Sequence, residues 1–209
     1  MFEWNCLYEE DGFWWNTQTR IIPPFPVDTY YLEPNVFALA KYDTLDITRG
    51  GIIIDKAHTS QILKFSRSYR ALPKQKFSLV ENSTDPVTVR KLKKDGKLYF
   101  YAVNTEPYPI TVTINLSENA TVYRLWSGEK LNESNEFTFT LDAFSLESFS
   151  TAKTADIVNY EIYIDANIEA NSLKAANELL ERLKNTKISV SGKQEFADRV
   201  EAAIVNKEY

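Results

Sequence analysis

The sequence predicts a mixed α and β protein: an antiparallel β-sandwich with an aromatic-rich α/β segment before it and a helical hairpin after it. Three observations predict this class. Residues 1–73 combine proline clusters with mixed apolar runs, residues 74–150 hold seven short strand-forming stretches, and residues 151–209 repeat apolar side chains at helical spacing. Strands that follow one another this closely favour a sandwich over βαβ units. We expect three domains with these boundaries.

The first segment is predicted to contain an irregular loop, an apolar run that can be a helix or a strand, and one helix. Four prolines between residues 21 and 35 predict an irregular loop there. The apolar run at 36–40 is compatible with either a helix or a strand, because it is too short for its period to decide. A helix is predicted over 60–71, where apolar residues recur at three- and four-residue steps; Thr59 is its cap and Pro73 ends it.

The middle segment is predicted to be entirely β. Its strands are expected at 77–81, 87–92, 98–103, 110–116, 121–126, 136–141 and 145–149. Asp95 and Gly96 supply the Asp-Gly pair that is typical of a tight hairpin. The side chains expected to point inward are Val103, Val112, Ile114 and Leu125.

The last segment is predicted to form two helices, one over 157–184 and one around 196–204. Its apolar stripe includes Ile164, Ile168, Leu179, Leu180 and Leu183. A two-helix hairpin cannot bury such a stripe by itself, since most helix stability comes from tertiary packing of the apolar face. The stripe must therefore dock on the sandwich, on the N-terminal segment or on a second copy of the chain, and of these we favour docking between copies, as a homo-oligomer.

The composition argues against several functional classes. The net charge is −5 and no basic block is present, which argues against nucleic-acid binding through phosphate contacts. No apolar run approaches the roughly 18 residues of a membrane span. One cysteine, Cys6, excludes an internal disulfide, and one histidine, His58, excludes a multi-histidine metal site. No GxGxxG, Walker A or HExxH motif is present, so neither a cofactor nor a metal is predicted.

Four short motifs in the β segment carry a resemblance to a known family. They lie at 99–104 (ending in Asn), 110–114 (alternating Ile, Thr and Val), 123–129 (ending in Gly-Glu) and 144–149 (Phe-Ser-Leu, then Phe after two residues). In this order they resemble the small β-sandwich that follows the catalytic barrel in many bacterial glycoside hydrolases. Residues 46–51, the helix predicted at 60–71 and Leu72-Pro73 are similar to the last strand-and-helix unit of such a barrel. The resemblance covers about 36–150, and the helical tail departs from it.

The resemblance implies a carbohydrate-related function and one candidate catalytic residue. In a retaining barrel enzyme the nucleophile lies at the end of the seventh strand among aromatic residues, and Glu3, between Phe2 and Trp4, has about that place here; the alternative is an exposed or hydrogen-bonded loop carboxylate. Glycoside hydrolysis uses a pair of carboxylates. The matching acid would come from the fourth strand, which this chain does not contain. We therefore expect the accessory C-terminal portion of a glycoside hydrolase-like protein, partnered by an upstream barrel and without a complete active site.

The aromatic residues of the first segment suggest a second hypothesis about function. Trp4, Trp14, Trp15, Tyr30 and Tyr31 can stack on sugar rings, with carbohydrate as the partner, or can pin a loop to the core by burying their rings. Both readings stay open. The alternative to an enzyme fragment is thus a non-catalytic carbohydrate-binding or protein-interaction module.

Overall fold

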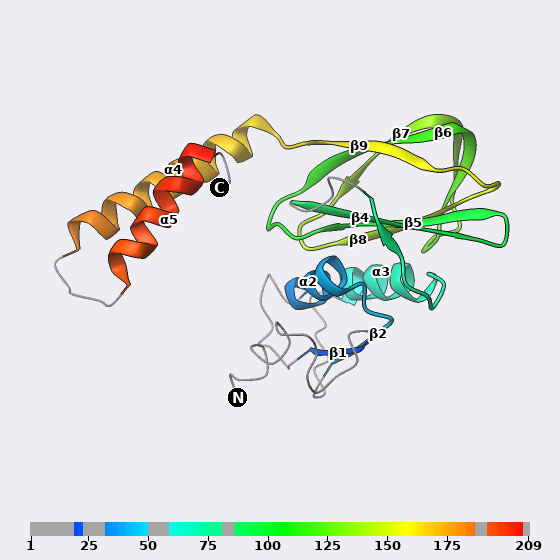
Figure 1. Cartoon of the computed structure of the whole chain (residues 1–209), viewed down its shortest axis with the longest axis horizontal. Coiled ribbons are helices and arrows are strands. Elements are labelled where there is room, and N and C mark those ends of the chain that lie inside the picture. Colours follow the sequence, from blue (N-terminus) through cyan, green and yellow to red (C-terminus); the bar gives the residue numbers. More distant parts are fainter. Residues whose placement is uncertain (1–18, 23–31, 50–58, 81–85, 187–191, 207–209) are drawn as a thin grey trace. The chain divides into compact units, whose positions relative to one another are not determined.

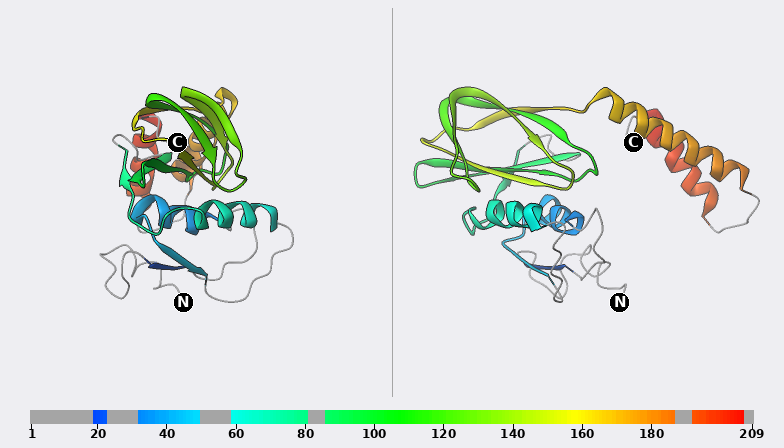
Figure 2. Two further views of the ribbon diagram at one scale, coloured as in Figure 1. Left: turned by 90° about the vertical axis from the view of Figure 1, so that its right-hand side faces the viewer. Right: turned by 180° about the vertical axis from the view of Figure 1, so that it is seen from behind.

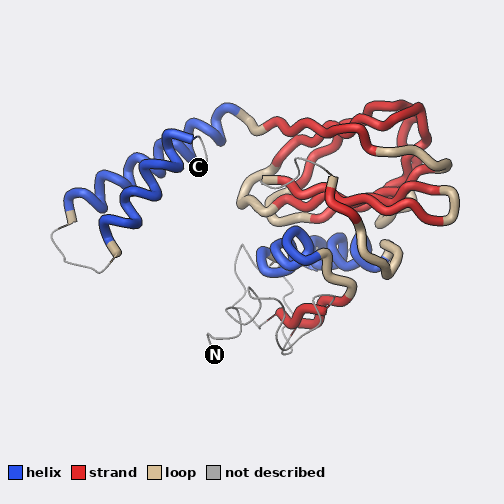
Figure 3. The backbone as a smooth tube through the Cα atoms, viewed as in Figure 1, coloured by secondary structure: helices blue, strands red, loops and turns tan. Residues whose placement is uncertain are grey.

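The computed structural model describes residues 19–22, 32–49, 59–80, 86–186 and 192–206 (Figure 1). The chain divides into two compact units, Met1–Tyr163 and Ile164–Tyr209. The first unit combines strand–helix pairs with an antiparallel sheet, and the second consists of helices (Figure 3). The class predicted from the sequence, a mixed protein with a β-sandwich and a C-terminal helical pair, is confirmed.

The first unit begins with two strand–helix pairs. They are β1 (Thr19–Ile22), α2 (Glu33–Tyr42), β2 (Asp46–Arg49) and α3 (Thr59–Arg70). β1 and β2 are parallel neighbours, with Thr19 opposite Asp46. Parallel strands need a crossover connection, and α2 lies within it. The helix predicted over 60–71 is confirmed as α3.

Helix α2 corrects the expectation of an irregular loop up to residue 35. It begins at Glu33 and takes Pro34 into its first turn, where a missing N–H costs no hydrogen bond. The undecided run at 36–40 lies inside this helix. The helix ends at Asp43, whose φ of 47° is left-handed and whose N–H donates to the Leu39 carbonyl.

Residues 78–163 form a seven-stranded antiparallel sheet that folds over into two layers (Figures 1 and 2). One layer runs β3-β4-β5-β8, and the other places β6 between β7 and β9. The strands are β3 (Ser78–Leu79), β4 (Val87–Lys94), β5 (Lys97–Asn104), β6 (Ile110–Arg124), β7 (Lys130–Leu141), β8 (Leu146–Thr151) and β9 (Ile157–Tyr163).

Strand β6 joins the two layers because it changes partners along its length. On one edge it pairs with β7 from Ile110 to Tyr123, and on the other edge residues 111–116 pair with β9 and residues 122–124 pair with β8. Its register against β7 shifts between Asn115 and Ala120, and such irregularities bend a strand from one layer into the next. The prediction of separate strands over 110–116 and 121–126 is wrong, since both belong to β6.

The hairpin predicted at Asp95 and Gly96 is confirmed between β4 and β5. Both residues have positive φ, 50° and 71°, as a two-residue turn of this kind requires. The turn fixes the register of the hairpin, with Lys94 opposite Lys97 and Val87 opposite Asn104.

The space between the two layers is filled by aromatic and β-branched side chains. The rings of Phe100 and Phe149, from neighbouring strands, lie 5.1 Å apart, and Phe137 from the other layer contacts both. Val112 and Ile114 are fully buried, as predicted. Leu125, also predicted to point inward, is only half-buried.

The opposite face of β5 and β8 is covered by α2 and α3, which lie against that layer (Figure 1). Val103 is buried on this face, in one cluster with the α2 and α3 side chains, and not between the sheet layers. Because both faces are covered, all six residues of β8 are buried. The buried members of this cluster are Leu32, Val36, Leu39, Phe65, Phe77, Tyr101, Val103, Phe144 and Leu146.

The second unit consists of α4 (Ala166–Asn185) and α5 (Lys193–Asn206). Asp165 caps α4 by accepting from the Asn167 N–H at 2.8 Å. The helix predicted from residue 157 starts only at 166, because 157–163 pair with β6 as β9. Leu180 and Ala197 are buried in this unit, whereas Leu179 and Phe196 are exposed.

Candidate functional site

The residues that the sequence assigns to catalysis and sugar contact lie outside the described residues. They are Glu3, Trp4, Trp14, Trp15, Tyr30 and Tyr31. His58 and Cys6 lie there as well. These assignments stay predictions, and the site below is built from described residues that the sequence did not single out.

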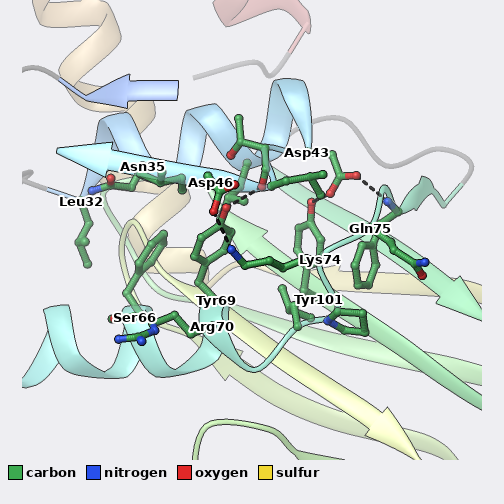
Figure 4. A pocket seen from close by; sticks show the side chains of 18 of the residues that line it. Leu32, Asn35, Asp43, Asp46, Ser66, Tyr69, Arg70, Lys74, Gln75 and Tyr101 are labelled. Carbon is green, nitrogen blue, oxygen red and sulfur yellow. Dashed lines mark hydrogen bonds and ion pairs between the residues drawn. The ribbon is translucent and has the colours of Figure 1, made fainter. Parts of the chain in front are cut away.

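A pocket of about 620 Å³ lies between α2, the start of β2, α3 and the segment after α3 (Figure 4). This volume is typical of small-molecule sites. Buried side chains form its floor and exposed ones its mouth. The floor includes Leu32, Asn35, Leu39, Asp43, Thr44, Phe65, Phe77 and Tyr101, and the mouth includes Asp46, Arg70, Lys74 and Gln75.

Asp43 is a buried carboxylate at the end of α2. The left-handed conformation that ends the helix is one that aspartate tolerates better than most residues. Its Oδ1 accepts a hydrogen bond from the Tyr101 hydroxyl at 2.6 Å, and its Oδ2 accepts one from the Phe77 N–H at 2.5 Å. Both oxygens are thereby engaged, so Asp43 joins α2 to β5 and to the segment before β3.

Tyr69 and Thr44 form the next contact along the pocket wall. The Tyr69 hydroxyl donates to the Thr44 carbonyl at 2.7 Å, and its ring lies nearly parallel to that of Phe65, with centroids 6.3 Å apart. The Thr44 hydroxyl is buried and has no hydrogen-bond partner among the described residues. The Thr44 hydroxyl is thus enclosed by the protein and is not presented to the pocket.

Basic side chains contact an acidic group at the mouth and backbone carbonyls at the end of α2. Lys74 pairs with Asp46 at 3.0 Å, and both side chains are largely exposed. Lys76 donates to the carbonyls of Tyr42 (2.7 Å) and Asp43 (2.9 Å), which the helix end leaves without intrahelical partners. Arg90 likewise donates to the Ala40 carbonyl at 2.9 Å.

The two phenols of the pocket have perturbed pKa values. Burial raises the pKa of Tyr69, and burial together with the charge of Asp43 raises the pKa of Tyr101 well above its ordinary value. Both phenols therefore stay protonated at neutral pH. Burial lowers the pKa of Lys76. With Asp43 engaged on both oxygens, the pocket floor offers no carboxylate free to act as a general base.

A second polar cluster ties α3 to the sandwich. Glu147, in β8, is almost fully buried and lies 2.7 Å from Lys64 Nζ. Trp126 donates its indole N–H to the same carboxylate at 3.1 Å, and Arg124 Nε lies 3.4 Å from it. Burial opposes the charge on Lys64, but its hydrogen bond to Glu147 and the nearby charges outweigh this, so the pKa of Lys64 is raised.

Sequence reasoning missed these residues for a physical reason. Asp43 and Glu147 are separated by about a hundred residues, and each gains its partner only when a helix meets the sheet. Tyr101 lies in a strand whose pattern predicts a core position, and its hydroxyl gives no sign of a carboxylate opposite. Nothing in the local pattern could have identified them.

The described part of the chain has neither a cluster of metal ligands nor a membrane-spanning helix. No group of three or more His, Cys, Asp or Glu side chains there is placed to hold a metal ion. No helix in the described ranges has the length and apolar character needed to cross a membrane.

No protein-family model matches the chain, and no curated protein matches it. Similar solved structures include alpha-galactosidase I from Mortierella vinacea (11% identity, TM-score 0.43, 70% of this chain and 38% of that one). An alpha-amylase from Geobacillus thermoleovorans is 12% identical with a TM-score of 0.45, and the match covers 72% of this chain and 43% of the amylase. A glycoside hydrolase family 30 xylanase from Clostridium acetobutylicum is 14% identical with a TM-score of 0.40, and the match covers 64% of this chain and 42% of the xylanase. The chain spans less than half the length of each of these three proteins.

Proposed function

We propose that the chain is the accessory C-terminal portion of a glycoside hydrolase-like protein: the last two strand–helix units of a barrel and the β-sandwich that follows them. The order of elements in the first unit carries this proposal. A parallel β1–β2 pair with α2 in its crossover is followed by α3, and α3 contacts β8 of the antiparallel sheet. The sequence resemblance, over 36–150, implies the last part of this order: one strand-and-helix unit followed by the sandwich.

The β1–β2 pair supports the presence of further strands in the functional protein. In the described residues these two strands pair only with each other. Parallel sheets are normally larger and covered on both faces, because their crossover helices must pack on them. An upstream barrel would supply the missing strands, and it is the partner that this proposal requires.

The sandwich in this proposal braces the barrel helices. Val103 and Leu146 bury the apolar faces of α2 and α3 on one side of the sheet. The buried contacts Tyr101–Asp43 and Glu147–Lys64 fix the two helices at separate points. These contacts favour a supporting role over a catalytic one for the sheet.

The proposal includes the absence of independent hydrolytic activity. A glycosidase needs two carboxylates about 5–9.5 Å apart at the scissile bond. Glu3 is the one candidate that the resemblance provides, and the second carboxylate of the pair would lie in the upstream barrel. General acid–base help alone contributes about 10²–10⁴-fold, so a chain with one carboxylate should be effectively inactive.

Hydrolysis of aryl glycosides by the purified chain tests this proposal. We expect a rate no greater than that of buffer for the wild type, for Glu3→Gln and for the matched variant Glu10→Gln. Turnover that disappears in Glu3→Gln and persists in Glu10→Gln would contradict the proposal and identify Glu3 as a nucleophile.

The alternative is a non-catalytic carbohydrate-binding or protein-interaction module. The aromatic residues Trp14 and Trp15, close to polar neighbours such as Asn16, favour it. Glycan-array binding that is lost in Trp14→Ala and Trp15→Ala, without any hydrolysis, would support this alternative.

A further inference from the structure

Strand β9 lies at an open edge of the sheet. Among the described strands it pairs with β6 alone, and β7 lies on the other side of β6. An antiparallel strand directs the backbone groups of alternate residues to either side, so β9 has a row of N–H and C=O groups that point away from β6. Val158 lies outside the β6 ladder, because the register passes from Asn115–Asn159 to Leu116–Ile157 and skips it. The edge therefore has backbone groups to offer to a further strand.

Exposed apolar side chains gather on this edge. Four large apolar side chains are exposed on the described strands of the sheet, and three of them belong to β9: Val158, Ile162 and Tyr163. The fourth, Leu79, lies in β3. Single exposed apolar residues are normal on a protein surface, whereas a group of them marks an interaction site. The β9 edge is such a group.

The other edges of the described sheet carry the features that prevent unwanted strand pairing. At one edge β3 is only two residues long, and β4 beside it carries three lysines. At the other, β7 carries one lysine and two glutamates, and then the exposed polar residues Thr138 and Thr140. Short strands and charged side chains, lysine above all, hinder pairing at an edge. β9 has seven residues, no proline, no lysine and one charged side chain, Glu161. This contrast indicates that the β9 edge is used for binding.

The sequence of β9 is complementary to itself in one antiparallel register. When Tyr160 lies opposite Tyr160 of a second copy, Glu161 lies opposite Asn159, and Ile162 lies opposite Val158. Aromatic and apolar cross-strand pairs stabilise a sheet, whereas like charges directly opposite each other destabilise it. A register centred on Glu161 would oppose two carboxylates, and one centred on Ile162 would pair only the last residues of the strand. The register centred on Tyr160 gives the longest overlap without opposed charges.

We propose that β9 pairs with β9 of a second copy of the chain, antiparallel and centred on Tyr160, so that the layer β7-β6-β9 continues into the same layer of the other copy. Both copies contribute the same surface, so the association closes at two copies. One strand edge buries much less than the roughly 1,200–2,000 Å² of a stable interface, so we expect weak pairing with a Kd of roughly 10 μM to 1 mM. The proposal depends neither on the proposed function nor on the apolar stripe of the helical unit.

Cysteine cross-linking of the full chain tests the register. Asn159→Cys and Glu161→Cys are made in separate Cys6→Ser chains, mixed at high concentration and oxidised. Directly opposed residues have Cα atoms about 4.5–5.5 Å apart, which a disulfide can span, whereas two copies of the same position lie on a diagonal about 7–8 Å apart. We expect the mixture to cross-link faster than either variant alone. Thr138→Cys and Thr140→Cys, on the β7 edge, are the matched control pair and should show no such preference.

Two charge variants at one exposed position test the same contact in solution. Asn159→Glu would face Glu161 of the second copy and repel it, and Asn159→Lys would attract it, whereas within its own chain this position faces the neutral Asn115. Sedimentation over a concentration series should show that Asn159→Glu raises the Kd by roughly twofold to thirtyfold, because two cross-strand pairs change at once. Asn159→Lys should not raise the Kd. Thr138→Glu, which adds the same charge to the β7 edge, should leave it unchanged.

Three outcomes would overturn the proposal. They are the absence of self-association at about 1 mM, equal effects of Asn159→Glu and Asn159→Lys, and a mixture of cysteine variants that cross-links no faster than each variant alone. Association through the helical unit would be insensitive to both Asn159 variants and sensitive to Leu179→Lys, and this result would also count against pairing at β9. If Asn159→Glu does not fold, the cross-linking rates still decide.

Discussion

The Tyr101 hydroxyl and the Asp43 carboxylate form a buried hydrogen bond of 2.6 Å that joins the middle of β5 to the end of α2. Tyr101 is 1% exposed and Asp43 is 4% exposed, so water does not compete for either group. Hydrogen bonds to an ionised acceptor are short and stronger than neutral ones. This contact fixes the distance between the sheet and the helix on the pocket floor.

Removing that hydroxyl should destabilise the first unit. Tyr101→Phe leaves the Asp43 charge buried with one fewer donor, and we expect the free energy of unfolding to fall by about 1.5–3 kcal/mol. Urea denaturation monitored by tryptophan fluorescence measures this change. Tyr99→Phe, on the same face of the same strand, is the control and should change stability by less than about 0.5 kcal/mol. Equal effects of the two substitutions would argue against the contact.

The contribution of Glu147 to stability should come from the burial of its carboxylate rather than from the number of ion pairs that it forms. Glu147→Gln weakens the contacts to Lys64, Trp126 and Arg124 at a buried position, and we expect a loss of about 1–3 kcal/mol. Glu129→Gln also removes an ion pair with Arg124, at 2.8 Å, but at an exposed site. It should cost less than about 1 kcal/mol by the same denaturation assay. A larger effect at Glu129 would contradict this ranking.

Stability should decline at alkaline pH. The pKa values of Tyr69 and Tyr101 are raised above their ordinary value of 10.0, and that of Lys64 is raised above 10.5. The unfolded chain therefore releases these protons first as the pH rises. Their contribution to stability is complete below about pH 10 and is lost as the pH climbs through the folded-state pKa values. Urea denaturation from neutral pH to above pH 10 measures the decline, which should be shallower in Tyr69→Phe and Tyr101→Phe.

The helical unit should respond differently to changes at its buried and exposed positions. Leu180 is 7% exposed, so Leu180→Asp buries a charge and should cost several kcal/mol, seen as loss of helical circular dichroism on heating. Leu179 (40% exposed) and Phe196 (45%) remain for the predicted contact between copies. Leu179→Lys should therefore lower the mass measured by light scattering, while Val205→Lys, at a 75% exposed site, should not. A monomeric wild type would contradict the homo-oligomer.

Much of the fold could be predicted because it depends on local pattern. The Asp95-Gly96 pair fixed one hairpin through its positive φ values, and the spacing of apolar residues after Thr59 located α3. Errors arose where tertiary pairing decides. Residues 157–163 have an ambiguous apolar pattern and become a strand only because β6 offers them an edge. Pro34 favours a break in the helix when only the sequence is considered, but it lies in the first turn of α2, where proline is tolerated.

The pocket could not be predicted in the same way. Its lining joins Asn35, Ser66 and Tyr101 from three elements with Thr44 from the loop between α2 and β2, and no short motif contains any two of them. The sequence instead drew attention to aromatic residues such as Trp14 and Trp15, because clusters of large rings stand out in composition. Pairing across distant elements is the information that a single sequence lacks.

The passage of β6 between the two layers has a consequence for how the sheet opens. The strand shares backbone hydrogen bonds with β7, β8 and β9, so neither layer can separate from the other without breaking the β6 ladder. The amides of Ile114 and Val122, which lie on either side of the register shift in β6, should then exchange with deuterium with one common free energy of opening. The sandwich would open as a single cooperative body, with no intermediate in which one layer stands alone.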